Sequence, residues 1–193
     1  MKKILVINGH PNKESFNAVI AQSYIKSALE AGSEVRYIEI GALDFNPNLQ
    51  FGYHQRMELE PDLVKALADI QWSEHQVWIH PLWWLGMPAI MKGFFDRAFL
   101  PGITFKSNKE GATEGLLQGR TGRIITTAGD LSLDIYEDIY ASSGLVQLKR
   151  GILEYCGISS IQDSFIGPLY ELNEHDRRKW IVQIEKFAIA DSV

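Results

Sequence analysis

The chain has 193 residues, of which 46% are hydrophobic and 22% charged, and its formal net charge is −5. This composition fits one globular domain spanning residues 1–193, and the mild acidity gives it no electrostatic reason to bind nucleic acid or an anionic membrane. The single cysteine, Cys156, excludes an intrachain disulfide, and no apolar stretch reaches the roughly 18 residues of a membrane span. We therefore expect a soluble, cytoplasmic, single-domain protein.

Short apolar runs alternate along the chain with longer amphipathic stretches. The pattern predicts strands over 3–7, 34–40, 76–80, 123–127 and 160–166, and helices over 15–31, 61–72, 88–99, 144–156 and 174–190. This alternation is typical of a parallel sheet covered by helices on both faces. We therefore predict an α/β, flavodoxin-like fold whose five-stranded parallel sheet has the order 2-1-3-4-5. The remaining long segments, 41–60 and 101–122, are expected to be extended loops.

The loop that follows the first strand, residues 8–17, is a candidate anion site. Ligands of such sheets bind beyond the carboxyl ends of the strands, and a helix N-terminus offers free N–H groups to an anion. His10, Ser15 and Asn17 could donate hydrogen bonds to a phosphate. The alternative is that Ser15 or Asn17 only caps the helix. The chain contains no G-x-G-x-x-G and no G-x-x-x-x-G-K-[ST] motif, which argues against a dinucleotide-type Rossmann site and a P-loop.

The loop after the third strand carries two adjacent tryptophans, Trp83 and Trp84, between Pro81 and Pro88. One interpretation is a stiff aromatic wall for a flat ligand, with backbone N–H groups directed at its polar edge. The other is hydrophobic or subunit packing, and each tryptophan could serve a different purpose. After the fourth strand, the small residues of 126–130 allow a ligand to approach the backbone closely.

The segment 81–99, PLWWLGMPAIMKGFFDRAF, closely resembles the flavin-binding segment of the NAD(P)H:quinone oxidoreductase family. That family includes DT-diaphorase and the bacterial ancillary oxidoreductases of glutathione-gated potassium efflux systems. Residues 8–17 are similar to its phosphate loop, and residues 151–157 to a later family segment. The resemblance implies a bound flavin, FMN or FAD, with NADH or NADPH as co-substrate. It also implies a homodimer whose active site lies at the subunit interface.

The resemblance further assigns cofactor contacts to three groups of residues. The groups are His10, Ser15, Phe16 and Asn17 at the phosphate and ribityl chain; Pro81, Leu82, Trp83 and Trp84 at the isoalloxazine ring; and Thr127, Ala128, Gly129 and Asp130 at its pyrimidine edge. No metal site is expected. The chain between the second and third strands is shorter than in the FAD-binding animal enzymes, which favours FMN.

The sequence differs from the family pattern at the residues that would transfer protons. The family has a tyrosine and a histidine beyond the fourth-strand loop, but no histidine lies between Gly129 and Gly157 here. Tyr136 and Tyr140 are the nearest candidates for catalytic residues. We expect the carboxylate of Asp130 to face solvent or cap the turn, because an inward charge would oppose a reduced flavin.

The predicted function is a flavin-dependent NAD(P)H oxidoreductase. Hydride would pass from NAD(P)H through flavin N5 to a quinone or another flat acceptor by a ping-pong mechanism. Three alternatives stay open: a regulatory ancillary subunit of a potassium efflux transporter, a one-electron flavodoxin-type carrier, and a reductase of nitro or azo compounds.

Overall fold

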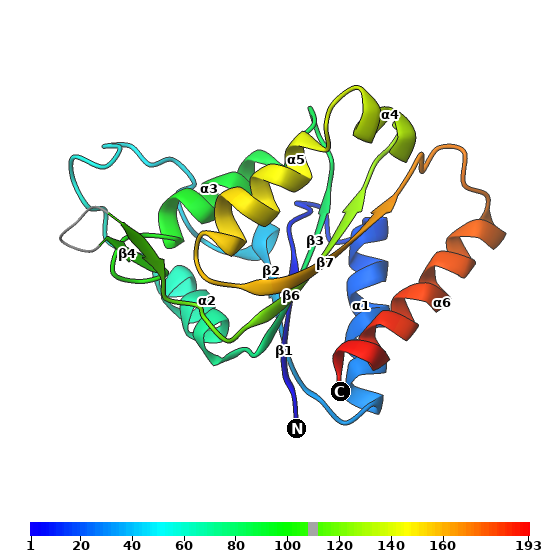
Figure 1. Cartoon of the computed structure of the whole chain (residues 1–193), viewed down its shortest axis with the longest axis horizontal. Coiled ribbons are helices and arrows are strands. Elements are labelled where there is room, and N and C mark those ends of the chain that lie inside the picture. The colour runs from blue at the N-terminus through cyan, green and yellow to red at the C-terminus, as the bar shows by residue number, and fades with distance from the viewer. Residues whose placement is uncertain (108–111) are drawn as a thin grey trace.

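A computed structural model describes residues 1–107 and 112–193 and has a parallel sheet at its centre (Figure 1). The sheet has the order β2-β1-β3-β6-β7, with every neighbouring pair parallel. Its strands are β1 (Lys3–Asn8), β2 (Glu34–Glu39), β3 (His75–Pro81), β6 (Thr121–Thr127) and β7 (Ser159–Ile166). Counted along the chain, these five strands have the predicted order 2-1-3-4-5. The flavodoxin-like fold is therefore confirmed.

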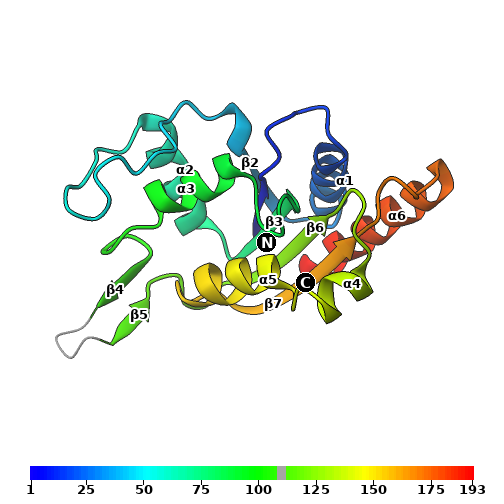
Figure 2. The ribbon, with the colours of Figure 1, turned by 90° about the horizontal axis from the view of Figure 1, so that it is seen from above.

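Helices cover both faces of this sheet (Figure 2). One face carries α1 (Phe16–Glu30) and α6 (Glu174–Asp191); the other carries α2 (Pro61–Trp72), α3 (Ala89–Ala98), α5 (Ser143–Val146) and the π-helical segment η2 (Gln147–Glu154). A short 3-10 helix, η1 (Ile40–Ala42), follows β2. Each face has its own hydrophobic core, and alternate residues of β1 point into each. Burial on both sides explains why β1 reads as a continuous apolar run.

Three segments of the chain depart from the sequence prediction. The segment 101–122, expected to be an extended loop, contains the antiparallel strands β4 (Phe105–Ser107) and β5 (Thr113–Gly115), while residues 108–111 lie outside the described part. A short helix, α4 (Leu133–Asp138), was not predicted; the side chain of Ser132 caps it. The predicted helix 144–156 begins as α5 and continues with π-helical rather than α-helical geometry in η2.

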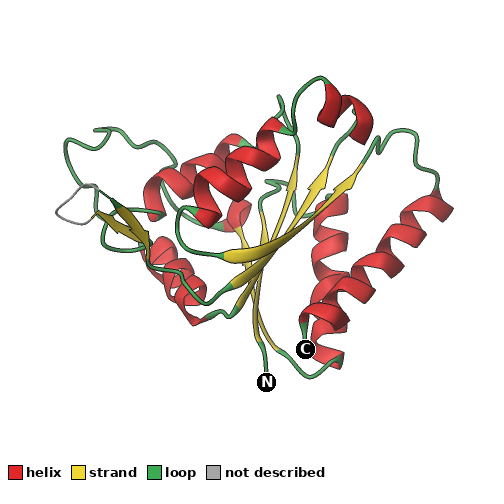
Figure 3. Cartoon of the chain, in the orientation of Figure 1, coloured by secondary structure: helices red, strands yellow, loops and turns green. Residues whose placement is uncertain are grey.

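The carboxyl ends of the strands lie at one edge of the sheet, with α4 and the start of α5 beside them (Figure 3). Both chain termini lie at the opposite edge, near the amino end of β1 (Figure 1). In the described ranges, no helix combines the length and the apolar character needed to cross a bilayer. The loops at the carboxyl edge are those for which the sequence predicts a ligand site.

Candidate functional site

The loop between β1 and α1 is shaped by side-chain hydrogen bonds to its own backbone. Ser15 is the N-cap of α1, and its Oγ accepts a hydrogen bond from the N–H of Ala18 at 3.3 Å. His10 Nδ1 accepts one from the N–H of Asn12 at 3.0 Å. A neutral His10 therefore carries its proton on Nε2, which has no partner among the described residues. Burial lowers the pKa of His10, which favours this neutral donor form.

Asn17, in the first turn of α1, has an unpaired buried donor. Only 2% of this residue is exposed. Its Oδ1 accepts a hydrogen bond from Thr127 Oγ1 at 3.0 Å, which joins α1 to the end of β6. Its Nδ2 has no partner within the described part of the chain. A buried donor without an acceptor is costly, so this amide group is suited to an acceptor supplied by a ligand.

The segment Trp83–Gly86, which we call the tryptophan hairpin, follows β3. Trp83 and Gly86 exchange both backbone hydrogen bonds, at 2.8 and 3.0 Å. The two central residues, Trp84 and Leu85, have φ values of 51° and 61°. Two such residues form a type I′ turn, which normally requires glycine or asparagine. A left-handed conformation at two bulky residues is strained, and such strain is concentrated at functional sites.

The two tryptophan side chains point to different surroundings. Trp83 is partly exposed and packs edge-on against the ring of His10, with 5.4 Å between centroids. Trp84 is fully exposed at the tip of the hairpin. At the base of the hairpin, the N–H of Leu82 donates to the carbonyl of Thr127 at 2.7 Å. The hairpin is thus fixed between the first and fourth of the predicted strands.

The loop after β6 brings small residues to the same edge. Thr127 and Ala128 are buried, whereas Asp130 is exposed. The N–H of Ala128 donates to the carbonyl of Ile166 at 3.0 Å, and the carbonyl of Gly129 accepts from the N–H of Tyr170 at 3.0 Å. A Cβ at Gly129 would lie 3.0 Å from the Tyr170 ring. The segment after β7 therefore covers this loop.

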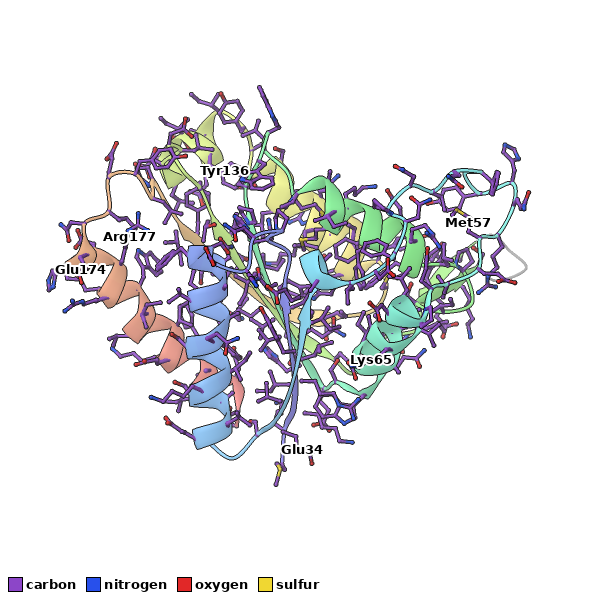
Figure 4. All side chains as sticks on the ribbon, turned by 180° about the vertical axis from the view of Figure 1, so that it is seen from behind. Glu34, Met57, Lys65, Tyr136, Glu174 and Arg177 are labelled. Atoms are coloured by element: carbon purple, nitrogen blue, oxygen red, sulfur yellow. The ribbon has the colours of Figure 1, made fainter. Side chains whose placement is uncertain are left out.

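Tyr170 and Arg177 also belong to this region, although no motif in the sequence points to them. Arg177, in α6, donates to the carbonyls of Leu169 at 2.7 Å and Leu172 at 3.2 Å. Its guanidinium also lies over the Phe16 ring, 5.3 Å from the centroid. It thereby joins the segment after β7 to the start of α1. Figure 4 labels Arg177 near the amino-terminal end of α6.

Comparison with known proteins agrees with this arrangement. A family model described as "Flavodoxin-like fold" matches residues 2–186. The chain belongs to this flavodoxin-like family. The crystal structure of Smu.1420 from Streptococcus mutans UA159 is similar to this flavodoxin-like chain, with 31% identity and a TM-score of 0.81. The similarity covers 97% of this chain and 99% of that one.

Two curated relatives of this flavodoxin-like protein have enzyme names. An uncharacterized NAD(P)H oxidoreductase of Haemophilus influenzae is 28% identical over 185 residues, covering 92% of this chain and 89% of that protein. NAD(P)H dehydrogenase (quinone) 1 of Rattus norvegicus is 22% identical over 188 residues, covering 86% of this chain and 69% of that protein.

In this flavodoxin-like chain, most of the predicted site residues meet at one edge. His10 contacts Trp83, and Asn17 and Leu82 both bond to Thr127. Tyr136 lies at the same edge, in an apolar cluster with Leu82 and Ala128, but it is buried and its hydroxyl accepts a hydrogen bond from the N–H of Leu145. Burial raises its pKa.

The donor set at this edge suits an anion joined to a flat ring. Asn17 Nδ2 and His10 Nε2 offer side-chain donors beside the first N–H groups of α1, which lack intrahelical acceptors. The small loop at Thr127–Asp130 and the tryptophan hairpin border the same edge. In the described residues, no cluster of three or more His, Cys, Asp or Glu side chains could hold a metal ion.

Proposed function

We propose that this chain is a flavin-dependent NAD(P)H oxidoreductase that reduces quinones or similar flat acceptors. The observation that carries the proposal is the buried Asn17 amide at the N-terminus of α1, whose Nδ2 has no partner in the described ranges, beside the strained tryptophan hairpin. The first feature fits a phosphate or ribityl oxygen, and the second borders a flat ring. The names of the two curated relatives support the choice of NAD(P)H and a quinone as substrates.

In this proposal the residues at the carboxyl edge bind and orient the cofactor. His10, Ser15, Phe16 and Asn17 hold the phosphate and ribityl chain, and the backbone of residues 81–86 lines the ring. The N–H groups of Gly129 and Asp130 stabilise negative charge at the pyrimidine edge, in the manner of an oxyanion hole. The N–H of Ala128, which the sequence also suggests for this role, is donated instead to the carbonyl of Ile166. Asp130 is exposed, which supports the expectation that its carboxylate faces solvent. When bound, the flavin supplies hydride transfer through N5 in a ping-pong cycle.

We further propose FMN as the flavin. The donors at the start of α1 form one compact group, which suits the single phosphate monoester of FMN. FAD would carry a second phosphate and an adenosine, and these would need further contacts. Tyr140, which is partly exposed after α4, is the remaining candidate for a residue that handles protons at the open face.

The test is a visible absorption spectrum of the purified protein, followed by release of the cofactor and its identification by mass. We expect a yellow protein that releases FMN and oxidises NADH or NADPH steadily when a quinone is supplied. A flavodoxin-type carrier would bind flavin without steady NAD(P)H oxidation. A colourless protein that flavin does not reconstitute would refute the proposal.

A further inference from the structure

Tyr136 lies in α4, close to the tryptophan hairpin, and only 2% of it is exposed. Figure 4 labels it at the carboxyl edge of the sheet. Its ring stacks on Phe165, with centroids 5.2 Å apart, and belongs to a small apolar cluster with Leu82 and Ala128. Its hydroxyl oxygen accepts a hydrogen bond from the N–H of Leu145 at 2.9 Å. The polar end of the side chain is therefore engaged with the start of the next helix.

The start of α5 lacks a side-chain cap of its own. The N-cap residue, Ser142, is left-handed (φ 49°) and makes no side-chain cap hydrogen bond. The first N–H groups of a helix require acceptors from outside it. The Tyr136 hydroxyl accepts a hydrogen bond from the N–H of Leu145 in the first turn, and so replaces the missing side-chain cap.

Gly144 brings this helix start into contact with the tryptophan hairpin. A Cβ at Gly144 would lie 2.4 Å from the carbonyl oxygen of Leu85 and 3.1 Å from the Tyr136 hydroxyl oxygen. There is thus no room for a methyl group between α5, Tyr136 and the hairpin. Leu85 is itself left-handed, a conformation that persists only where the surroundings hold it.

We propose that Tyr136 is a positioning residue: by capping α5, its hydroxyl holds Gly144 against Leu85 and so fixes the tryptophan hairpin in its strained, flavin-binding conformation. That this conformation binds flavin rests on the proposed function. The link from Tyr136 to the hairpin rests only on contacts within this chain. It also gives Tyr136 a different role from proton transfer at the open face of the site.

The experiment compares Tyr136→Phe with Tyr24→Phe in the full-length protein. Both substitutions remove only a buried hydroxyl that makes a hydrogen bond, because Tyr24 donates to Asp191 at the opposite edge of the sheet. Amide hydrogen exchange of Trp83 and Gly86 reports opening of the hairpin, with or without flavin. Titration with FMN gives the dissociation constant.

The hydrogen bond of the Leu145 N–H is part-buried, and losing one such bond corresponds to about a tenfold change in an equilibrium. We therefore expect Tyr136→Phe to speed exchange at Gly86 about tenfold and to weaken FMN binding about tenfold. Tyr24→Phe is expected to lower the melting temperature while leaving both readouts unchanged. Unchanged Gly86 exchange in folded Tyr136→Phe would overturn the proposal, and lost activity with unchanged exchange and affinity would instead assign Tyr136 to catalysis.

Gly144→Ala provides a second variant in case Tyr136→Phe does not fold. Alanine is favoured over glycine inside a helix, so helix propensity alone predicts a small gain in stability. The contact with the Leu85 carbonyl predicts instead faster exchange at Gly86. Exchange at the wild-type rate would overturn the proposal. If the wild-type protein binds no FMN, the proposed function fails, while the exchange comparison still tests the positioning role.

Discussion

Asn17 presents a buried amide donor that no other described residue pairs, and a substitution of nearly the same shape can replace this donor by an acceptor. Asn17→Asp keeps the oxygen that accepts from Thr127 but replaces the Nδ2 donor by a carboxylate oxygen. A negative charge beside a bound phosphate is unfavourable, and hydrogen bonds to charged groups contribute about 1.5–3 kcal/mol. We expect FMN binding, measured by quenching of flavin fluorescence, to weaken by at least about tenfold.

Asn173→Asp is the matched control for this prediction. Asn173 caps α6, where its Oδ1 accepts from the N–H of Asp176 at 3.0 Å. Aspartate caps a helix about as well as asparagine, so the same change of charge is expected to leave FMN binding unaltered. Equal weakening in the two variants would show a general effect of charge rather than a contact at Asn17.

At this scale, the sequence predicts the types of site residue better than their individual roles. It leaves Ser15 and Asn17 as alternative caps of α1, and the structure shows that Ser15 is the cap. The different part played by Asn17 depends on Thr127, which is 110 residues away in the chain. Arg177 and Tyr170 were not found, because only the folded chain brings the segment after β7 to the loop after β6.

Among the elements, the pair β4–β5 is held by a close contact with the turn that follows η2. A Cβ at Gly115, the last residue of β5, would lie 2.2 Å from the carbonyl carbon of Cys156 and 2.3 Å from the nitrogen of Gly157. Both are backbone atoms, which cannot move aside as a side chain does. We expect Gly115→Ala to lower the free energy of unfolding, measured in urea, by about 1–3 kcal/mol.

Gly151→Ala tests whether the lower free energy of unfolding comes from the backbone contact or from replacing a glycine as such. Gly151 lies in η2, five residues before Cys156. Among the described residues, no heavy atom outside the adjoining helix backbone and the two neighbouring residues lies within 4 Å of a Cβ built there. The free energy of unfolding should stay the same or rise slightly. A Gly115→Ala protein as stable as the wild type would contradict the expected overlap.

The elements that the sequence predicted are those with a strong local pattern. Five strand segments and five helical segments are visible in the sequence pattern, and the flavodoxin-like order is predicted from their alternation. The strands β4 and β5 have three residues each, which is too short for any periodic pattern. The π-helical geometry of η2 was also missed, because a π-helix and an α-helix bury nearly the same residues.

Over the whole molecule, Asp191 joins the C-terminal helix to both β6 and α1 at the edge opposite the candidate site. Arg123 donates two hydrogen bonds to its carboxylate, at 2.6 and 2.9 Å, and Tyr24 donates a third at 2.8 Å. His75 Nε2 lies 3.3 Å from the same carboxylate. Burial alone would raise the pKa of Asp191, but Arg123 and His75 hold it well below its usual range.

Because the pKa of Asp191 is lower in the folded than in the unfolded protein, its ionised form stabilises the fold. This contribution is complete above the unfolded pKa of about 3.9 and is lost as the pH falls further. We expect Asp191→Asn to lower the free energy of unfolding by about 3 kcal/mol at neutral pH, since it leaves Arg123 without its buried partner. The difference in the free energy of unfolding between Asp191→Asn and the wild type should become smaller as the pH falls towards about 3.

Urea unfolding across this range of pH measures the effect of Asp191→Asn. Glu30→Gln is the control, because Glu30 belongs to an exposed pair with Lys26 at 3.9 Å. That variant is expected to change the free energy of unfolding by less than about 1 kcal/mol at any pH. A constant difference between wild type and Asp191→Asn from about pH 7 to about pH 3 would contradict the assignment of the lowered pKa.

The apolar surface beside the candidate site predicts an assembly of two chains. Trp84 at the hairpin tip, Ile139 and Tyr140 after α4, and Val146 in α5 all expose large apolar side chains. Exposed apolar groups gathered at one edge of a protein mark interaction surfaces. We expect light scattering to give about twice the chain mass of 21.8 kDa.

Trp84→Asp should shift this assembly towards single chains, because it places a charge at the tip of the hairpin while aspartate tolerates the left-handed backbone. Ile189→Asp, on the partly exposed surface of α6, is the matched control and is expected to keep the wild-type mass. Quinone reduction should fall with the loss of assembly in Trp84→Asp and should recover at higher protein concentration if the second chain completes the site. A single-chain wild type with full activity would show that each chain works alone and that Trp84 serves the acceptor instead.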